Sequence, residues 1–392
     1  MKYLVLITAP NLKIEEYLID WEKRLRSELK VILYPHIAVE PINGATSLAV
    51  IETDQISNAV TYCQNLLKTA TDVKLIPVLD EKEAAEELVK FNESKLRADG
   101  EYAEADISKI EGFGSTSRLE ILPLIDWHTE NQDLQVETGV SYLVKTDDTT
   151  ILFDMGLNNN DEDPSPLLQN MEKLGVSVED IDIIFITHNH SDHVGGGKWA
   201  EKKTFSLSGR QIQLDGKRAY TPIPMTYPGL EPTHSPDPMI IGKGIATTGT
   251  IPNSIFFYGH TVEQSLAINV EDKGIVLIVG CGHQTLPRLL ERTSALFDES
   301  LYGILGGLHY PVMGGPIELF GYALHKHRGT GKPPWEQITH DELSANIELL
   351  KKLNPKVVAL SPHDSSELSL KAFKDAFPDE CRKINVGKTI VI

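Results

Sequence analysis

Three histidines and one aspartate fall within six consecutive positions, at His188, His190, Asp192 and His193. Imidazole nitrogens suit zinc, and a carboxylate adds a harder oxygen ligand. In an extended chain His188 and His190 project to the same side, whereas Asp192 and His193 are adjacent and diverge. The spacing therefore predicts two metal ions, about 3.5–4 Å apart, that share one hydroxide and hold a substrate oxygen between them.

The residues around this cluster indicate how it is positioned. Residues 181–186 are apolar and β-branched, which predicts a buried strand that ends just before the first histidine. Sites of α/β sheets gather at such strand ends. The glycines at 195–197 allow a tight turn with no side chain crowding the ions. A polar loop with chance histidines is the alternative, and the preceding strand argues against it.

The cluster resembles the signature of the metallo-β-lactamase superfamily, whose members are αββα sandwiches with a two-metal hydrolytic site. Residues 151–156 are similar to the LFDTG strand of that family, with Met155 in place of threonine. The resemblance implies that Asp154 supports the metal loop by orienting a ligand histidine. An ordinary aspartate at a strand end is the alternative.

Four downstream histidines lie beside apolar runs and are candidates for the remaining ligands. They are His260, His283, His309 and His363. The order of their motifs, GHT, GCGH, GGLH and SPHDS, resembles the dihydropterin ribofuranosylaminobenzene-phosphate synthase-like branch of the superfamily over roughly residues 118 to 392. The motif at 137–141 lacks the histidine of that branch, and the motif after His363 lacks its cysteine and glycine. These departures bear on the substrate more than on the metal.

The resemblance also implies how the ligands are shared. His283 is the third ligand of one metal, and His363 joins Asp192 and His193 on the other. Cys281 stands where many members have a bridging aspartate, and a thiolate can bind zinc. A small buried residue at a strand end is an equal alternative for Cys281.

The other histidines have weaker contexts. His309 either binds substrate or supports the ligands, and His260 has either a structural or a ligand role. His325 and His327 form a basic patch that could attract an anionic group, although a solvated loop is the favoured interpretation. Ordinary surface or packing positions are expected for the remaining ones: His36, His128, His234 and His340.

Composition narrows the class of protein. The chain has 392 residues and a net charge of −19, which argues against a nucleic-acid groove. The three cysteines, Cys63, Cys281 and Cys381, are scattered and imply no disulfide framework, so a cytoplasmic location is expected. No run is long enough to span a bilayer. We expect a small-molecule substrate and neither a nucleic-acid nor a membrane partner, and a homodimer is left open.

Two domains are expected. Residues 1–100 form the accessory domain, 101–117 the linker and 118–392 the catalytic domain. The predicted order βαββαβ in the first is ferredoxin-like and suits a regulatory, substrate-covering or dimerising module. Its elements are strands at 3–9, 31–39, 47–53 and 73–79 and helices at 14–29 and 56–67. Residues 201–253 read as a loop-rich insertion that is either a lid or a packing loop.

The sequence thus predicts an αββα metallo-β-lactamase sandwich preceded by a small ferredoxin-like α+β domain. The expected function is a hydrolase with two zinc ions, Mn²⁺ or iron being the other candidates. A bridging hydroxide, oriented by Asp192, would attack a carbonyl or phosphorus centre. The branch implies a phosphorylated or pterin-like substrate. Two alternatives are a di-iron redox enzyme, although flavodiiron reductases place a glutamate where His190 stands, and a non-catalytic ligand sensor.

Overall fold

The computed structural model describes residues 2–8, 46–52, 72–78, 81–256, 258–312, 318–319, 322–323, 325, 328–332 and 338–392. The chain divides into two compact units, Met1–Asn92 and Glu93–Ile392. His36, Cys63 and His327 lie outside the described residues. Within the described ranges, every helix is too short or too polar to traverse a lipid bilayer.

The first unit contains a three-stranded antiparallel sheet. Its strands are β1 (Lys2–Thr8), β2 (Thr46–Glu52) and β3 (Asp72–Val78), in the order β2-β1-β3. Each strand is shifted by one residue from one of the four predicted strands. The remaining predicted strand, at 31–39, and both predicted helices fall outside the described residues, so the ferredoxin-like domain stays a prediction. The acidic, alanine-rich residues 81–100 also predict a helix, and the structure has one there, α3 (Glu81–Glu104).

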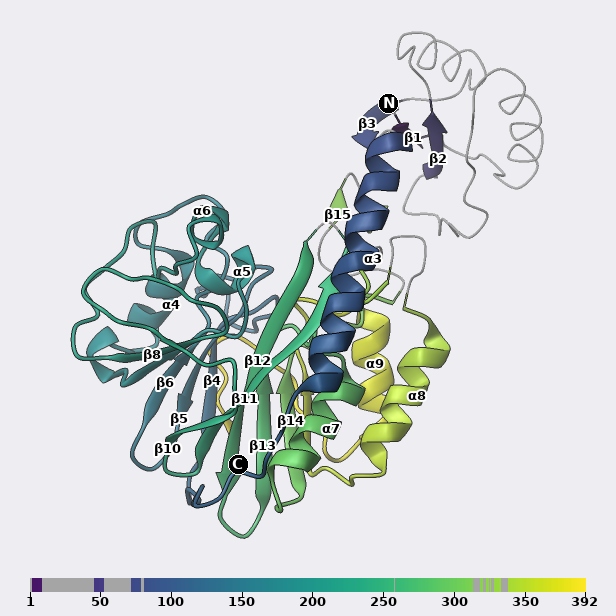
Figure 1. Cartoon of the computed structure of the whole chain (residues 1–392). Helices are drawn as coiled ribbons and strands as arrows, with labels where there is room; N and C mark the ends of the chain where they lie inside the picture. The colour runs from purple at the N-terminus through teal and green to yellow at the C-terminus, as the bar shows by residue number, and fades with distance from the viewer. Residues whose placement is uncertain are drawn as a thin grey trace. The chain divides into compact units, whose positions relative to one another are not determined.

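The second unit is built on two sheets (Figure 1). The first sheet has the order β18 (Ile390–Val391), β4 (Glu120–Ile125), β5 (Ser141–Lys145), β6 (Thr150–Phe153), β7 (Ile183–Phe185), β8 (Arg218–Thr221) and β9 (Thr233–His234). The second has the order β10 (Met239–Gly242), β11 (Ile245–Ile255), β12 (Gly259–Val270), β13 (Gly274–Val279), β14 (Leu301–Gly306) and β17 (Val357–Leu360). A short hairpin is formed by β15 (Glu318–Leu319) and β16 (Tyr322–Ala323).

Helices cover the outer faces of both sheets. Residues of α7 (Leu286–Leu296), α8 (His340–Lys351) and α9 (Glu367–Ala376) share a buried core with strands of the second sheet. Residues of α4 (Pro166–Lys173) do the same on the first sheet, and a short 3-10 helix follows at Val178–Asp180. The sequence also predicts helices at 284–296, 341–353 and 367–377, and the structure confirms each bound to within two residues.

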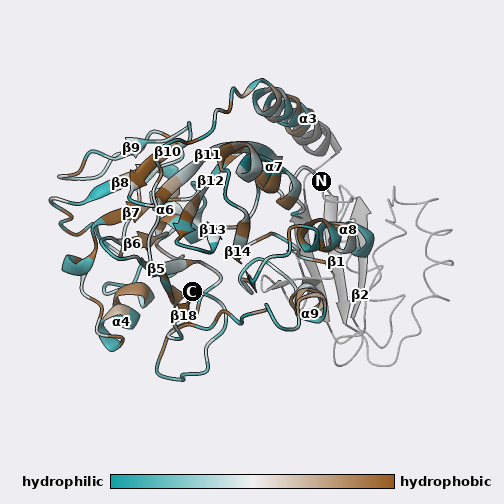
Figure 2. Cartoon of the chain, turned by 90° about the horizontal axis from the view of Figure 1, so that it is seen from below, coloured by the Kyte–Doolittle hydropathy of each residue, from teal (hydrophilic) through white to brown (hydrophobic). Residues whose placement is uncertain are grey.

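A third core lies between the sheets. It joins Ile121 and Ile183 of the first sheet to Leu266 and Ile278 of the second, all at most 1% exposed. Figure 2 shows the hydrophobic residues concentrated in the strands. Strands buried on both faces are expected to be continuously apolar, as β13 (GIVLIV) is. The result is the predicted αββα sandwich.

Two segments differ from the loops expected from sequence. Residues 201–253 contain β8, β9, β10 and most of β11, which belong to both sheets, so this segment is not a single loop-rich insertion. Within residues 101–117, Phe113 is 5% exposed and packs in the core of the second sheet. Its carbonyl accepts a hydrogen bond from the amide of Gly244 at 2.8 Å. The segment expected to be a linker is thus packed at this point.

Candidate metal centre

The candidate ligands follow strands whose carboxyl ends face the same edge of the sandwich. β7 leads to His188, β13 leads to Cys281 and His283, and β17 leads to His363. β13, β14 and β17 are parallel neighbours, so their following loops emerge together. The sequence prediction that strand ends deliver the ligands is correct for these elements.

A one-turn helix carries Asp192 and His193. This helix, α5 (Ser191–Val194), ends at Gly195, whose φ is +86°. A Cβ at Gly195 would lie 2.1 Å from the carbonyl oxygen of Ser206, so both its conformation and its surroundings require glycine. The chain then begins α6 (Gly197–Glu201). The glycine after the cluster therefore permits the turn, as expected.

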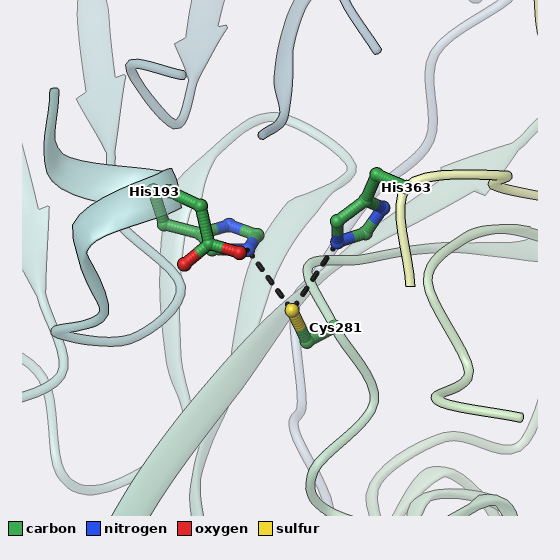
Figure 3. Close-up of side chains that lie close together, drawn as sticks. His193, Cys281 and His363 are labelled. Atoms are coloured by element: carbon green, nitrogen blue, oxygen red, sulfur yellow. Dashed lines mark hydrogen bonds and ion pairs between the residues drawn. The ribbon is translucent and has the colours of Figure 1, made fainter. Parts of the chain in front are cut away.

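Two groups of side chains that could hold a metal ion meet at one cysteine. The first, here called the Asp192 group, consists of Asp192, His193, Cys281 and His363. The second, the His283 group, consists of His188, Cys281 and His283. Within each group the candidate ligand atoms all lie within 4.8 Å of one another. Cys281 Sγ lies 3.0 Å from His193 Nε2 and 3.2 Å from His363 Nε2 (Figure 3).

His190 lies beside the His283 group without belonging to it by distance. The centroid of its ring is 4.5 Å from that of His188 and 5.0 Å from that of His283. The structure thus brings together the six residues predicted to be ligands and the uncertain Cys281. Among the described residues, no other group of this kind is present.

Asp154 orients two of the histidines on the side away from the cluster, His193 directly and His188 through a hydroxyl. Its carboxylate accepts hydrogen bonds from His193 Nδ1 at 2.7 Å and from the Thr187 hydroxyl at 2.7 Å. Because the hydroxyl donates to Asp154, it accepts from His188 Nδ1 at 2.9 Å. Both rings therefore carry their proton on Nδ1 toward the support and direct Nε2 toward the cluster. This is the geometry implied for Asp154 by the family resemblance.

A second buried carboxylate holds His363 in the same way. The Ser361 hydroxyl donates to Asp126 at 2.7 Å and accepts from His363 Nδ1 at 2.6 Å. Asp126 also accepts from the hydroxyl of Tyr142 at 2.6 Å and is fully buried. The hydroxyl relays the constraint from the carboxylate to the imidazole, which leaves His363 Nε2 directed at Cys281.

The loop that carries Cys281 and His283 is fixed by Glu263. This buried carboxylate accepts hydrogen bonds from the backbone amides of residues 281, 282 and 283, at 3.0, 3.0 and 2.7 Å. Burial raises the pKa of Glu263 to about 7, although these amides and His193 act against it. His283 Nδ1 lies 3.2 Å from the Thr330 hydroxyl. Three amides on one carboxylate make this loop rigid.

Burial keeps most of the imidazoles neutral. It lowers the pKa of His188, His283 and His363 well below the usual value, and that of His190 to about 4. A neutral imidazole has a free lone pair, so these side chains suit a cation without first losing a proton. The atom His188 Nε2 is buried and has no hydrogen-bond partner among the described groups, as expected of an atom meant for a metal.

His193 and Cys281 behave differently. Burial lowers the pKa of His193, but the charges of Asp154 and Asp192 outweigh it and raise the pKa to about 9. Burial, followed by the nearby carboxylates, raises the pKa of the Cys281 thiol well above its usual value. A cation reverses this balance by favouring the thiolate.

The structure separates the two undecided histidines. His309 lies near the cluster, with its ring centroid 4.5 Å from that of His283, and its Nε2 donates to the Arg328 carbonyl at 2.7 Å. His260 forms an ion pair with Glu101 at 2.6 Å and belongs to neither group. His325 is 4% exposed, so the expectation of a solvated loop was wrong for it. Its burial follows from packing against His309, 5.4 Å away between ring centroids.

Several supporting residues were missed from the sequence. Thr187 directly precedes His188, and Ser361 lies two residues before His363, so a small hydroxyl residue beside a candidate ligand was an available signal. Residues 263–266 match a motif of the branch, but nothing local assigns a supporting role to Glu263, and no local signal marks Asp126 or Thr330, because each acts on a residue distant in the chain.

Comparison with known proteins agrees with this geometry. Residues 134–281 match the model of the metallo-beta-lactamase superfamily. A relative from Methanocaldococcus jannaschii, named 7,8-dihydropterin-6-methyl-4-(beta-D-ribofuranosyl)-aminobenzene-5'-phosphate synthase, is 22% identical over 328 residues, covering 71% of this chain and 98% of that protein. This relative bears the name of the branch to which the sequence motifs pointed.

Solved structures were also compared with the chain. Tm1679, described as a metal-dependent hydrolase of the beta-lactamase superfamily, is 18% identical with a TM-score of 0.47, covering 70% of this chain and 99% of its own. YhfI from Bacillus subtilis, a metallo-beta-lactamase fold protein, is 12% identical with a TM-score of 0.42, covering 70% and 100%. The assignment rests on the superfamily match and on the two packed sheets described above. The chain therefore carries a metallo-β-lactamase domain with two adjoining groups of candidate metal ligands.

Proposed function

We propose that this protein is a metal-dependent hydrolase with two zinc ions. Asp192, His193 and His363 would hold one ion, and His188, His190 and His283 would hold the other. Cys281 belongs to both groups, so its sulfur would be available to either ion. The observation that carries the proposal is the sharing of Cys281 by two groups of otherwise separate ligands.

The residues fit such a pair of ions in chemistry as well as in position. Nitrogen and sulfur donors are those that zinc prefers, and Asp192 adds one oxygen. Four histidines have Nδ1 beside a supporting carboxylate or hydroxyl, which leaves Nε2 for the ion. Bound zinc supplies a hydroxide nucleophile near neutral pH and stabilises negative charge that develops on the substrate.

The side chains have separate tasks in this proposal. Asp192 is 25% exposed at its side chain, the least buried member of its group, so its carboxylate can orient the attacking oxygen as well as bind. Asp154 and Asp126 hold His193 and His363 in place. The rigid loop on Glu263 keeps Cys281 and His283 from moving during the reaction.

The proposed substrate is a small ester or related molecule that carries a phosphate or a pterin-like group. The support for this class is the name of the Methanocaldococcus jannaschii relative, which contains a dihydropterin and a 5'-phosphate. Hydrolysis at a carbonyl or a phosphorus centre fits the ligand set equally well.

Metal analysis of the protein purified without added metal tests the proposal. We expect two zinc ions per chain, together with hydrolysis in a panel of phosphoesters, thioesters and lactones. His190→Ala should lose metal and hydrolysis, because the His283 group would keep two imidazoles and a shared sulfur. His340→Ala, an exposed histidine at the start of α8, is the matched control.

Three results would contradict the proposal. The first is full metal occupancy in His190→Ala. The second is stoichiometric iron together with oxygen reduction, and the third is that the zinc-loaded protein hydrolyses no member of the panel. The second result would favour a di-iron redox enzyme, and the third a ligand sensor.

A further inference from the structure

A pair of side chains beside the metal centre takes no part in holding the ligands. Arg328 and Tyr258, here called the Arg328–Tyr258 pair, contact each other through a 3.2 Å hydrogen bond from the guanidinium to the phenol oxygen. The guanidinium carbon also lies 5.6 Å from the centroid of the Tyr258 ring. Tyr258 is 49% exposed and Arg328 is half-buried, so solvent reaches both.

This pair lies next to the candidate ligands. The ring centroid of Tyr258 is 4.7 Å from that of His190. On the other side, the Arg328 carbonyl accepts from His309 Nε2, and His309 packs on His283. The backbone of Arg328 is thus held by His309, next to His283, and its side chain is held by Tyr258, next to His190.

The charge on Arg328 has no counter-ion within the part of the chain that the structure describes. No carboxylate there lies within ion-pair distance of its guanidinium, in contrast to Arg288, which pairs with Asp99. The Arg328 guanidinium is therefore a cation without a described counter-ion, beside the candidate ligands of a chain whose net charge is −19.

The hydrogen-bonding capacity of the pair suits an oxyanion. Arg328 uses one guanidinium nitrogen on Tyr258, which leaves further N–H donors. Because Tyr258 accepts that bond, its own hydroxyl hydrogen remains free to donate. A planar fork of charged donors with a neutral hydroxyl beside it matches the oxygens of a phosphate group.

We propose that the Arg328–Tyr258 pair binds the phosphate group of the substrate whose scissile bond lies at the metal centre. This inference rests on the proposed hydrolase function and makes it more specific. The substrate is a phosphate-bearing small molecule whose anionic end is held about one aromatic ring away from the ligand His190. Arg328 and Tyr258 then determine substrate affinity, while the ligands hold the metal.

Phosphate affinity of four proteins tests this proposal. Inorganic phosphate is titrated calorimetrically into zinc-loaded wild type, Arg328→Ala, Arg328→Lys and Tyr258→Phe, with zinc content measured in each. A charge-assisted hydrogen bond is worth about tenfold or more in affinity, so Arg328→Ala should weaken phosphate binding by at least about tenfold. Arg328→Lys should lie between, and Tyr258→Phe should cost about threefold, as expected for a neutral hydrogen bond. Zinc content should stay at the wild-type value.

Arg210→Ala is the matched control, because Arg210 is 77% exposed and pairs with Asp163, away from both ligand groups. Equal phosphate affinity in wild type, Arg328→Ala and Arg328→Lys would overturn the proposal. So would a loss that is equally large in Arg210→Ala. Acetate is titrated in parallel, and an Arg328-dependent affinity for acetate but not for phosphate would overturn the phosphate assignment in favour of a carboxylate.

The same titration in metal-free protein separates this inference from the proposed function. If wild type takes up no zinc, the hydrolase proposal fails, whereas an Arg328-dependent phosphate affinity would still support the anion site. If zinc binds and the Arg328 variants retain full phosphate affinity, the hydrolase proposal stands and the anion site is rejected.

Discussion

The two ligand groups share Cys281 but differ in how they are supported. In the Asp192 group, His193 is held directly by the Asp154 carboxylate and His363 by Asp126 through a hydroxyl. In the His283 group, His188 is held by Asp154 only through the Thr187 hydroxyl, and His283 Nδ1 lies 3.2 Å from the Thr330 hydroxyl, so neither imidazole contacts a carboxylate directly. Negative charge on and behind a ligand strengthens its hold on a cation. The Asp192 group should therefore bind the first ion and the His283 group the second.

Removing the shared sulfur should have the largest effect. In Cys281→Ser both groups lose a ligand, so we expect both ions to bind much more weakly, beyond the roughly 10–100-fold typical of losing an outer supporting residue. Metal content after dialysis measures this, with Cys381→Ser as the control because Cys381 lies outside both groups. Wild-type metal affinity in Cys281→Ser would reduce Cys281 to a buried structural residue.

The second-largest expected difference is in how the zinc affinity of each group changes with pH. The raised pKa values of His193, about 9, and of Cys281 mean that both carry a proton at pH 7 that a metal must displace. His188 and His283 are already neutral because their pKa values are lowered. The first ion should then release about two side-chain protons, which corresponds to about a hundredfold gain in affinity per pH unit below pH 9, and the second ion no more than the one proton lost when water becomes hydroxide. Proton release on stepwise addition of zinc in weak buffer measures this.

Equal proton release for both ions would contradict the assignment of Cys281 and His193 to the group that fills first. Release of protons only with the second ion would reverse the order of filling.

Supporting hydroxyls should produce the smallest effects, each confined to one group. Ser361→Ala breaks the relay from Asp126 to His363 and should weaken the first ion by about tenfold. Thr330→Val removes only the longer contact to His283 and should weaken the second ion by less. Stepwise zinc titration resolves the two constants. Tyr142→Phe, which removes a donor to Asp126 outside the relay, is the control. Loss of the same constant in both variants would show that the groups are not independently supported.

The sequence was sufficient to predict which side chains gather at one edge of the sandwich, because each candidate ligand follows an apolar strand and the family resemblance selects among the histidines. The run before His188 and the runs before Cys281 and His363 are local patterns, and parallel strands bring their ends to one edge without further information. The αββα class was implied by the family resemblance, and the alternation of strands and helices agrees with it. The candidate ligands and the fold were therefore predicted from the same segments.

The supporting contacts could not be predicted, because they join residues far apart in the chain. Asp126 reaches His363 through Ser361, which lies 235 residues away. His260 stands in a motif similar to that of a ligand, yet it pairs with Glu101, 159 residues distant, on the helix α3. Such pairings depend on tertiary packing, which no local pattern encodes.

X-ray absorption at the zinc edge, on protein loaded with two zinc ions per chain, reports whether Cys281 joins two neighbouring ions. We predict a sulfur neighbour at about 2.3 Å and a second zinc at about 3.5–4 Å. Both features should disappear together in Cys281→Ser. A wild-type spectrum with only nitrogen and oxygen neighbours and no nearby zinc would contradict the shared cysteine on which the two-ion centre depends.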